Sequence, residues 1–155
     1  MVMTKSELLE TAQLLIQPGK AMAEEYASKR ELLVNLLNKK MLERLDLDEM
    51  VGENNVEMMK DNHANHARFL ESVFYSYNPE VLVDTVLWVF RAYRSRNFRS
   101  TYWAAQLNAW VEIYKENLSE DCYKEVYPFY NWMQINIPSF TALAEEAMED
   151  PISTH

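Results

Sequence analysis

Apolar residues recur along this chain at intervals of three and four positions, which is the spacing of one face of an α-helix. One such stripe consists of Met22, Tyr26, Leu33, Leu37 and Met41. A second stripe consists of Trp103, Leu107, Trp110 and Tyr114. Glycine occurs only twice, and β-branched residues are few beside leucine, alanine, glutamate, methionine and lysine, so local propensity also favours helix over sheet. The sequence therefore predicts an all-α protein.

Helix start and stop signals divide the chain into about six to seven helices. Thr4 and Glu7 have the spacing of a capping box, and Pro18-Gly19 ends the helix that they begin. Asn78 and Pro79 are an N-cap and a first-turn proline. Later helices are predicted over 20–45, 54–77, 79–94, from 100, over 119–134 with an interruption or kink near Pro128, and from 138. These elements predict one compact bundle, either globin-like or orthogonal.

The chain length of 155 residues suits a single domain. We expect a helical domain over 1–150, made of an N-terminal helical arm (1–50) and an aromatic-rich core (54–148), followed by a frayed tail (151–155). Tyr26 is the only aromatic residue before Phe69. Aromatic side chains supply large contact areas, so any pocket for a planar ligand is expected in the second part.

The helix predicted over 20–45 is the basis for a prediction of self-association. Four leucines widen its apolar stripe, namely Leu32, Leu33, Leu36 and Leu37. We expect this face to exceed what one chain covers, and pairing of such helices about a two-fold axis is the commonest way to bury it. The sequence therefore predicts a homodimer through residues of the N-terminal helices.

Charge and hydropathy exclude several classes of partner. The net charge of −9 opposes binding to phosphate backbones, so we expect no nucleic-acid partner. The run from Val86 to Phe90 is far shorter than the ~20 apolar residues of a membrane span, and no signal peptide is visible. Cys122 is the only cysteine, which suits a reducing compartment and a packing role. We expect a cytoplasmic protein without a membrane partner.

Two histidines interrupt an apolar helical stripe. His63 and His66 occupy positions in a series whose other members are Val56, Met59, Leu70, Val73 and Tyr77. Buried imidazoles need hydrogen-bond partners or a ligand. We favour partners within the core, such as tyrosine, asparagine or backbone groups, and we therefore expect depressed pKa values for both rings. Contact with an organic ligand and coordination of a metal or haem are the alternatives.

The surrounding sequence does not complete a metal site. No Glu-x-x-His motif occurs, and neither a second histidine pair nor a cysteine pair is available for zinc. We therefore expect no bound metal and no cofactor.

Tryptophans and arginines complete the set of candidate ligand-binding residues. Trp88, Trp103 and Trp110 are the leading candidates to line a pocket for a planar or apolar ligand. Four arginines lie close together in sequence, at Arg91, Arg94, Arg96 and Arg99. They either offset a helix dipole and pair with acidic side chains, or recognise a carboxylate, a phosphate or an acidic partner surface. The candidate ligand-binding residues are His63, His66, Trp88, Arg91, Arg94, Arg96, Trp103 and Trp110.

One segment of the chain resembles a known class of domain. The resemblance covers about residues 61 to 110 and rests on Asn62-His63-Ala64-Asn65-His66-Ala67-Arg68-Phe69-Leu70, Asn78-Pro79-Glu80-Val81-Leu82-Val83-Asp84, Trp88-Val89 and Arg94-Ser95-Arg96. These segments are similar to the helical N-terminal modules of bacterial signalling proteins, which precede cobalamin-binding, STAS or kinase domains. Some of those modules adopt a globin-like fold without haem. The resemblance implies a sensory or regulatory role exerted through a partner or a ligand.

The function predicted from the sequence is non-catalytic. No complete catalytic or nucleotide-binding motif occurs, and no nucleophile and base can be paired, so we do not expect an enzyme. We predict a regulatory or sensory helical domain that binds a partner protein or a small ligand. The alternative is a haem- or metal-binding helical protein that uses His63 or His66.

Overall fold

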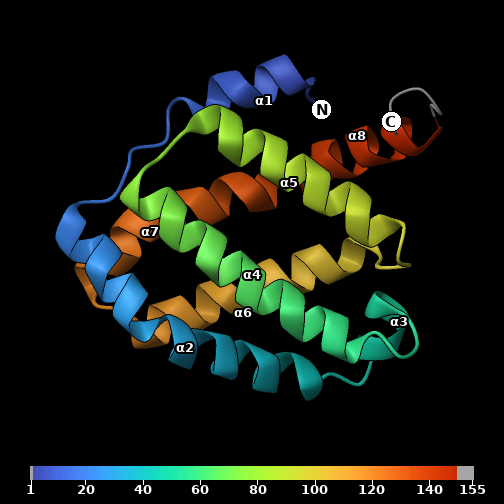
Figure 1. Cartoon of the computed structure of the whole chain (residues 1–155), viewed down its shortest axis with the longest axis horizontal. Helices are drawn as coiled ribbons and strands as arrows, with labels where there is room; N and C mark the ends of the chain where they lie inside the picture. Colours follow the sequence, from blue (N-terminus) through green and yellow to red (C-terminus); the bar gives the residue numbers. More distant parts are fainter. Residues whose placement is uncertain (1, 150–155) are drawn as a thin grey trace.

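The computed structural model describes residues 2–149, which form eight α-helices and contain no strand (Figure 1). The helices are α1 (Lys5–Ala12), α2 (Lys20–Leu42), α3 (Leu47–Val51), α4 (Val56–Tyr75), α5 (Pro79–Arg94), α6 (Ser100–Asn117), α7 (Glu120–Ile135) and α8 (Ile137–Glu149). The all-α prediction is confirmed. The tail predicted to fray, 151–155, lies outside the described residues.

The residues that the sequence indicates as helix starts form the predicted N-terminal caps. Thr4 Oγ1 accepts a hydrogen bond from the Glu7 N–H at 3.2 Å, and Glu7 Oε1 accepts one from the Thr4 N–H at 3.1 Å. Asn78 Oδ1 caps α5 by accepting from the N–H groups of Glu80 and Val81. These bonds pair backbone donors that have no partner within their own helix, and so they fix where each helix begins.

The structure has one more helix than the seven that the sequence predicted, because the segment between the helices predicted over 20–45 and 54–77 contains α3. Leu47, Met50 and Val51 bring their side chains into the core, and α3 packs on α6. The Arg99 N–H donates to the Met50 carbonyl oxygen at 2.8 Å and ties the short helix to the start of α6. The interruption expected near Pro128 is absent, since α7 continues through that exposed residue as a helix.

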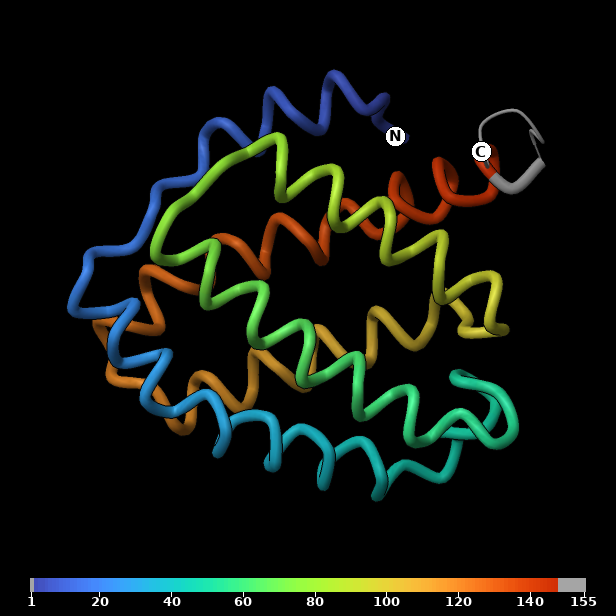
Figure 2. The backbone as a smooth tube through the Cα atoms, in the orientation of Figure 1, coloured from blue at the N-terminus to red at the C-terminus, as the bar shows by residue number. Residues whose placement is uncertain are grey.

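Helices α4 and α5 are joined by a short connection and run in opposite directions, with α6 and α7 behind them (Figures 1 and 2). Helix α2 packs against α4, α6 and α7, while α5 packs against α1 and α8. Direct backbone contact between α4 and α5 is sparse by comparison. Side chains from the helices behind therefore complete the core between these two helices.

The apolar stripe of α2 is covered within one chain. Leu33 and Leu37 have no exposed surface, whereas Leu32 is 50 % exposed and Leu36 is partly buried. The part of α2 left for any intermolecular contact is thus the edge that carries Leu32, not the stripe of Leu33 and Leu37. Within residues 2–149, no helix is both long and apolar enough to cross a membrane.

Candidate functional site: a cavity between four helices

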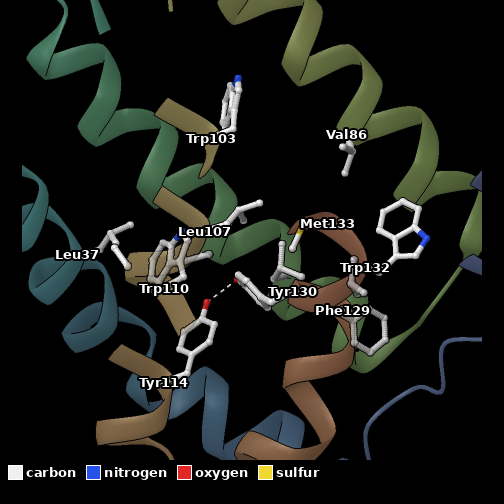
Figure 3. Close-up of a cluster of buried hydrophobic side chains, with 14 of the residues drawn as sticks. Leu37, Val86, Trp103, Leu107, Trp110, Tyr114, Phe129, Tyr130, Trp132 and Met133 are labelled. Carbon is white, nitrogen blue, oxygen red and sulfur yellow. Dashed lines mark hydrogen bonds between the residues drawn. The ribbon is translucent and has the colours of Figure 1, made fainter. Parts of the chain in front are cut away.

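A partly open cavity of about 290 Å³ lies between α4, α5, α6 and α7. Figure 3 shows Val86, Leu107 and Met133 converging on this region from three of these helices. The apolar side chains of its wall are Phe69, Leu70, Val86, Val89, Phe90, Trp103, Leu107 and Met133, with Trp88 and Tyr93 at the α5 side. The volume exceeds the ~150 Å³ of an apolar cavity that holds benzene and lies at the lower end of small-molecule pockets. A ligand of one or two rings fits this space.

The wall of this cavity carries no charged side chain. Two larger hollows, of about 660 and 820 Å³, are open grooves on the surface and include Lys, Arg, Asp or Glu side chains. A concave, mostly apolar wall with a few polar groups is the usual composition of a small-molecule site, whereas charged grooves are common on any protein surface. We therefore take the smaller cavity, whose wall carries no charged side chain, as the candidate site.

The register of α5 decides which of its side chains face the cavity. Because Asn78 caps the helix and Pro79 begins it, Val86 and Phe90 point inward, whereas Val81 is 48 % exposed. Phe90 stacks on Trp103 of α6 at a ring-centroid distance of 4.8 Å. This aromatic pair joins the two helices at one end of the cavity.

His66 brings a polar group to the wall. Its Nε2 atom lies 2.7 Å from the Tyr130 hydroxyl, which lies 2.5 Å from the Tyr114 hydroxyl, and Tyr114 in turn lies 3.1 Å from the Tyr26 hydroxyl. These four residues belong to α4, α7, α6 and α2, so the tyrosine chain defined by them connects the cavity to the far side of the core. Burial raises the pKa of all three tyrosines, which keeps their hydroxyls protonated.

A second polar cluster lies on another part of the wall. Asn62 Oδ1 accepts hydrogen bonds from the Tyr102 hydroxyl at 2.8 Å and from Gln106 Nε2 at 2.6 Å. Gln106 has no exposed surface, and its Oε1 atom has no hydrogen-bond partner within the described part of the chain. An unpaired buried carbonyl oxygen costs free energy.

His63 lies one turn from His66 but outside the cavity wall. Its Nδ1 atom is 2.6 Å from Asn38 Oδ1, an interaction that joins α4 to α2. Burial lowers the pKa of His63 to about 3, and burial together with the nearby His63 lowers the pKa of His66 to about 3. The two histidines have the tyrosine and asparagine partners that the sequence led us to expect, and burial shifts both pKa values in the expected direction. His63 Nε2 has no hydrogen-bond partner within the described residues.

The cavity brings together three of the residues singled out from the sequence, namely His66, Trp88 and Trp103. Trp110 is fully buried behind the wall, where it stacks on His66 at a centroid distance of 5.2 Å. Trp88 is 57 % exposed and also lines the groove of about 660 Å³ beside α8. It therefore stands between the cavity and the surface.

The arginines that cluster in the sequence do not line one site. Arg91 lies in the groove beside α8 with Lys5, and Arg94 pairs with Glu145 at 3.3 Å. Arg96 is exposed in the connection to α6, and Arg99 lines the separate groove of about 820 Å³ near α3. None of the four belongs to the cavity wall. Among residues 2–149, no group of three or more His, Cys, Asp or Glu side chains is arranged to hold a metal ion.

Sequence reasoning missed Gln106, Asn62 and Tyr130. Gln106 belongs to a second three-and-four series on α6, with Tyr102, Ala109 and Ile113, all of which are buried. A polar residue within an apolar series is the signal that identified the histidines, and it applies to Gln106 equally. Tyr130 gives no such signal, because its partnership with His66 depends on tertiary packing.

Comparison of this chain with protein-family models, with curated proteins and with solved structures finds no match.

Proposed function

We propose that this protein is a non-catalytic regulatory domain that binds a small, mostly apolar ligand in the cavity between α4 and α5. The observation that supports this proposal most strongly is the combination of a mostly apolar wall, which carries no charged side chain, with the imidazole of His66 and the buried amide of Gln106 among its lining residues. A close-packed core without a ligand-binding role normally fills such a space.

A regulatory output would require that occupancy of the cavity alter the surface. Trp88 and Thr85 line both the cavity and the groove beside α8, so a ligand that displaces Trp88 changes the shape of that groove. A partner protein that binds in the groove would then respond to the presence of the ligand. A globin-like arrangement without haem, and kinship with bacterial sensory modules, are part of this proposal and are supported by the resemblance of residues 61 to 110.

The proposal is tested by calorimetric titration with indene, an uncharged two-ring probe. We expect binding by the unmodified protein, and loss of binding by Val86→Phe, because the larger ring occupies the cavity. Val81→Phe is the matched control, since the same change is made on the exposed face of the same helix. Equal binding by both variants, or no binding by the unmodified protein, would contradict the proposal.

A second candidate is favoured by one observation, the presence of His66 in the wall of an apolar cavity. Haem or a metal ion would use its Nδ1 atom, because Nε2 faces the Tyr130 hydroxyl. His63 lies outside the wall and would not contribute a second ligand. An absorption spectrum with a Soret band that disappears in His66→Ala, in protein purified from its own host, would favour this candidate over the first.

A further inference from the structure

The side chains that line the cavity differ in exposure, and the difference follows the helices. All the lining residues of α6 and α7 are buried, and together they form the floor of the cavity: Trp103, Gln106, Leu107 and Met133. The two lining residues that are exposed are Asn65 of α4 and Trp88 of α5, and every partly buried one also belongs to α4 or α5. Solvent therefore reaches the cavity between α4 and α5, on the side opposite the floor.

The polarity of the wall changes in the same direction. The floor is apolar apart from Gln106, whose side chain has no exposed surface. The mouth, which we define by Asn65, Thr85 and Trp88, carries an amide and a hydroxyl. Asn65 Oδ1 accepts a hydrogen bond from Arg68, whereas Asn65 Nδ2 and the Thr85 hydroxyl have no hydrogen bond to another described residue. Polar groups that can contact a ligand thus lie at the mouth.

The volume limits how much of a ligand can lie inside. About 290 Å³ holds one or two rings and leaves no space for a long chain. A polar group pressed against the floor would lose its hydrogen bonds to water, whereas a polar group at the mouth keeps them. Thr85 and Trp88 also line the groove beside α8, so a chain that leaves through the mouth emerges next to that groove.

We infer that the ligand is an amphiphile longer than the cavity. Its apolar ring lies on the floor formed by α6 and α7, and its polar chain leaves between α4 and α5 past Asn65, Thr85 and Trp88. This ligand class rests on the proposed function, since it concerns the same cavity and adds the orientation of its ligand. The emerging chain lies beside the α8 groove, where a partner protein would meet it.

Calorimetric titration with three naphthalene probes tests the orientation. Naphthalene has no chain, a naphthyl ether carries one triethylene glycol chain, and a naphthyl diether carries two such chains at opposite ends. We expect the one-chain ether to bind within about tenfold of naphthalene, because its chain remains in water. The diether should not bind measurably, because one of its chains would have to lie against the floor.

Matched controls show where the ring binds. Triethylene glycol alone should not bind. Val86→Phe should abolish binding of naphthalene and of the one-chain ether, whereas Val81→Phe, on the exposed face of α5, should leave both unchanged. In NMR of the one-chain ether bound to the unmodified protein, ring hydrogens should show nuclear Overhauser effects to the methyl groups of Leu107 and Met133, and chain hydrogens to that of Thr85.

The outcomes separate this ligand class from the proposed function. If naphthalene binds and the one-chain ether does not, the cavity encloses its ligand, and the inferred amphiphile is wrong while the proposed function stands. Binding of the diether as tight as that of naphthalene, or chain hydrogens in contact with Leu107 and Met133, would also overturn the inferred orientation. If naphthalene itself does not bind, the proposed function fails and the ligand class fails with it.

Discussion

His63 and His66 lie one turn apart on α4, yet their environments differ. His63 faces Asn38 of α2 and is sealed in the core, whereas His66 faces Tyr130 of α7 on one side and the cavity on the other. The pKa of each is lowered to about 3, chiefly because burial disfavours the charged ring. Both rings are therefore neutral at physiological pH. Because the folded core disfavours their charged forms, the stability of the fold depends on pH.

The direction of that pH dependence follows from the lowered pKa values. In the unfolded chain a histidine has a pKa of about 6.5, whereas in the folded chain both histidines have a pKa of about 3. Between these two pH values only the unfolded chain binds the proton. The contribution of each histidine to stability is therefore complete above about pH 6.5 and is lost as the pH falls. Each histidine should contribute a slope of up to about 1.4 kcal/mol per pH unit. Urea denaturation between pH 7.5 and 5 measures it. The His66→Gln variant should lose roughly half of the slope, and an unchanged slope in His63→Gln/His66→Gln would contradict the account.

Tyr130 links His66 to the other two residues of the tyrosine chain. Tyr130→Phe removes the partner of His66 and of Tyr114 while the ring remains, so we expect a loss of about 1–3 kcal/mol in the free energy of unfolding. Tyr123→Phe is the control, because Tyr123 is partly buried on the same helix and its hydroxyl has no hydrogen bond to any described residue; this change should cost less than about 0.5 kcal/mol. Chemical denaturation measures both losses. Equal losses would show that the hydrogen bonds of the tyrosine chain do not contribute to the free energy of unfolding.

At the scale of the helices, local sequence signals predicted most boundaries and tertiary contacts decided the rest. The caps at Thr4 and Asn78 depend on residues within three positions, and they are present as predicted. The helix α3 was missed because five residues give too short a series to recognise, and its burial depends on α6. The wall of the cavity was predicted only in part, since the inward register of α5 and the partners of Gln106 depend on how distant helices pack.

Tertiary packing also determines which leucines of α2 contribute to the core. Leu33 has no exposed surface, so Leu33→Ala should create a core cavity and cost about 2–5 kcal/mol. Leu32 is its neighbour and is 50 % exposed, so Leu32→Ala should cost less than about 0.5 kcal/mol. Thermal or chemical denaturation of the pair tests whether α2 is placed with the correct face toward α4 and α6. A larger loss for Leu32→Ala would require a rotated helix.

Two properties concern the whole molecule. One is the effect of a ligand in the cavity on stability, and the other is the exposure of apolar residues in the N-terminal region. A ligand that binds only the folded chain stabilises it in proportion to the logarithm of its concentration, by about 2.7 kcal/mol at one hundred times its dissociation constant. Leu14 and Ile16 are mostly exposed between α1 and α2, and Leu32 is half exposed on α2. Stabilisation by a ligand would act on the whole helical bundle, whereas the exposed apolar side chains lie on its outer edge.

The homodimer predicted from the N-terminal helices would use this outer edge. Light scattering at micromolar concentration should then give twice the chain mass of 18.3 kDa. Leu32→Glu should shift the population toward monomer without unfolding it, because this side chain contributes little to the core. Leu33→Glu and Leu37→Glu would unfold the chain instead and are unsuitable as a test. A mass of one chain for the unmodified protein throughout that range would contradict the prediction.

We propose above that a small, mostly apolar ligand binds in the cavity between α4, α5, α6 and α7. The most direct test of this proposal is NMR of the methyl groups in the presence of indene. We expect intermolecular nuclear Overhauser effects from the ring hydrogens of the probe to the methyl groups of Val86, Leu107 and Met133, which line the cavity, and none to Leu33 or Leu37 in the core beneath α2. Contacts to methyl groups outside the cavity wall, or no contacts at a saturating concentration, would contradict it.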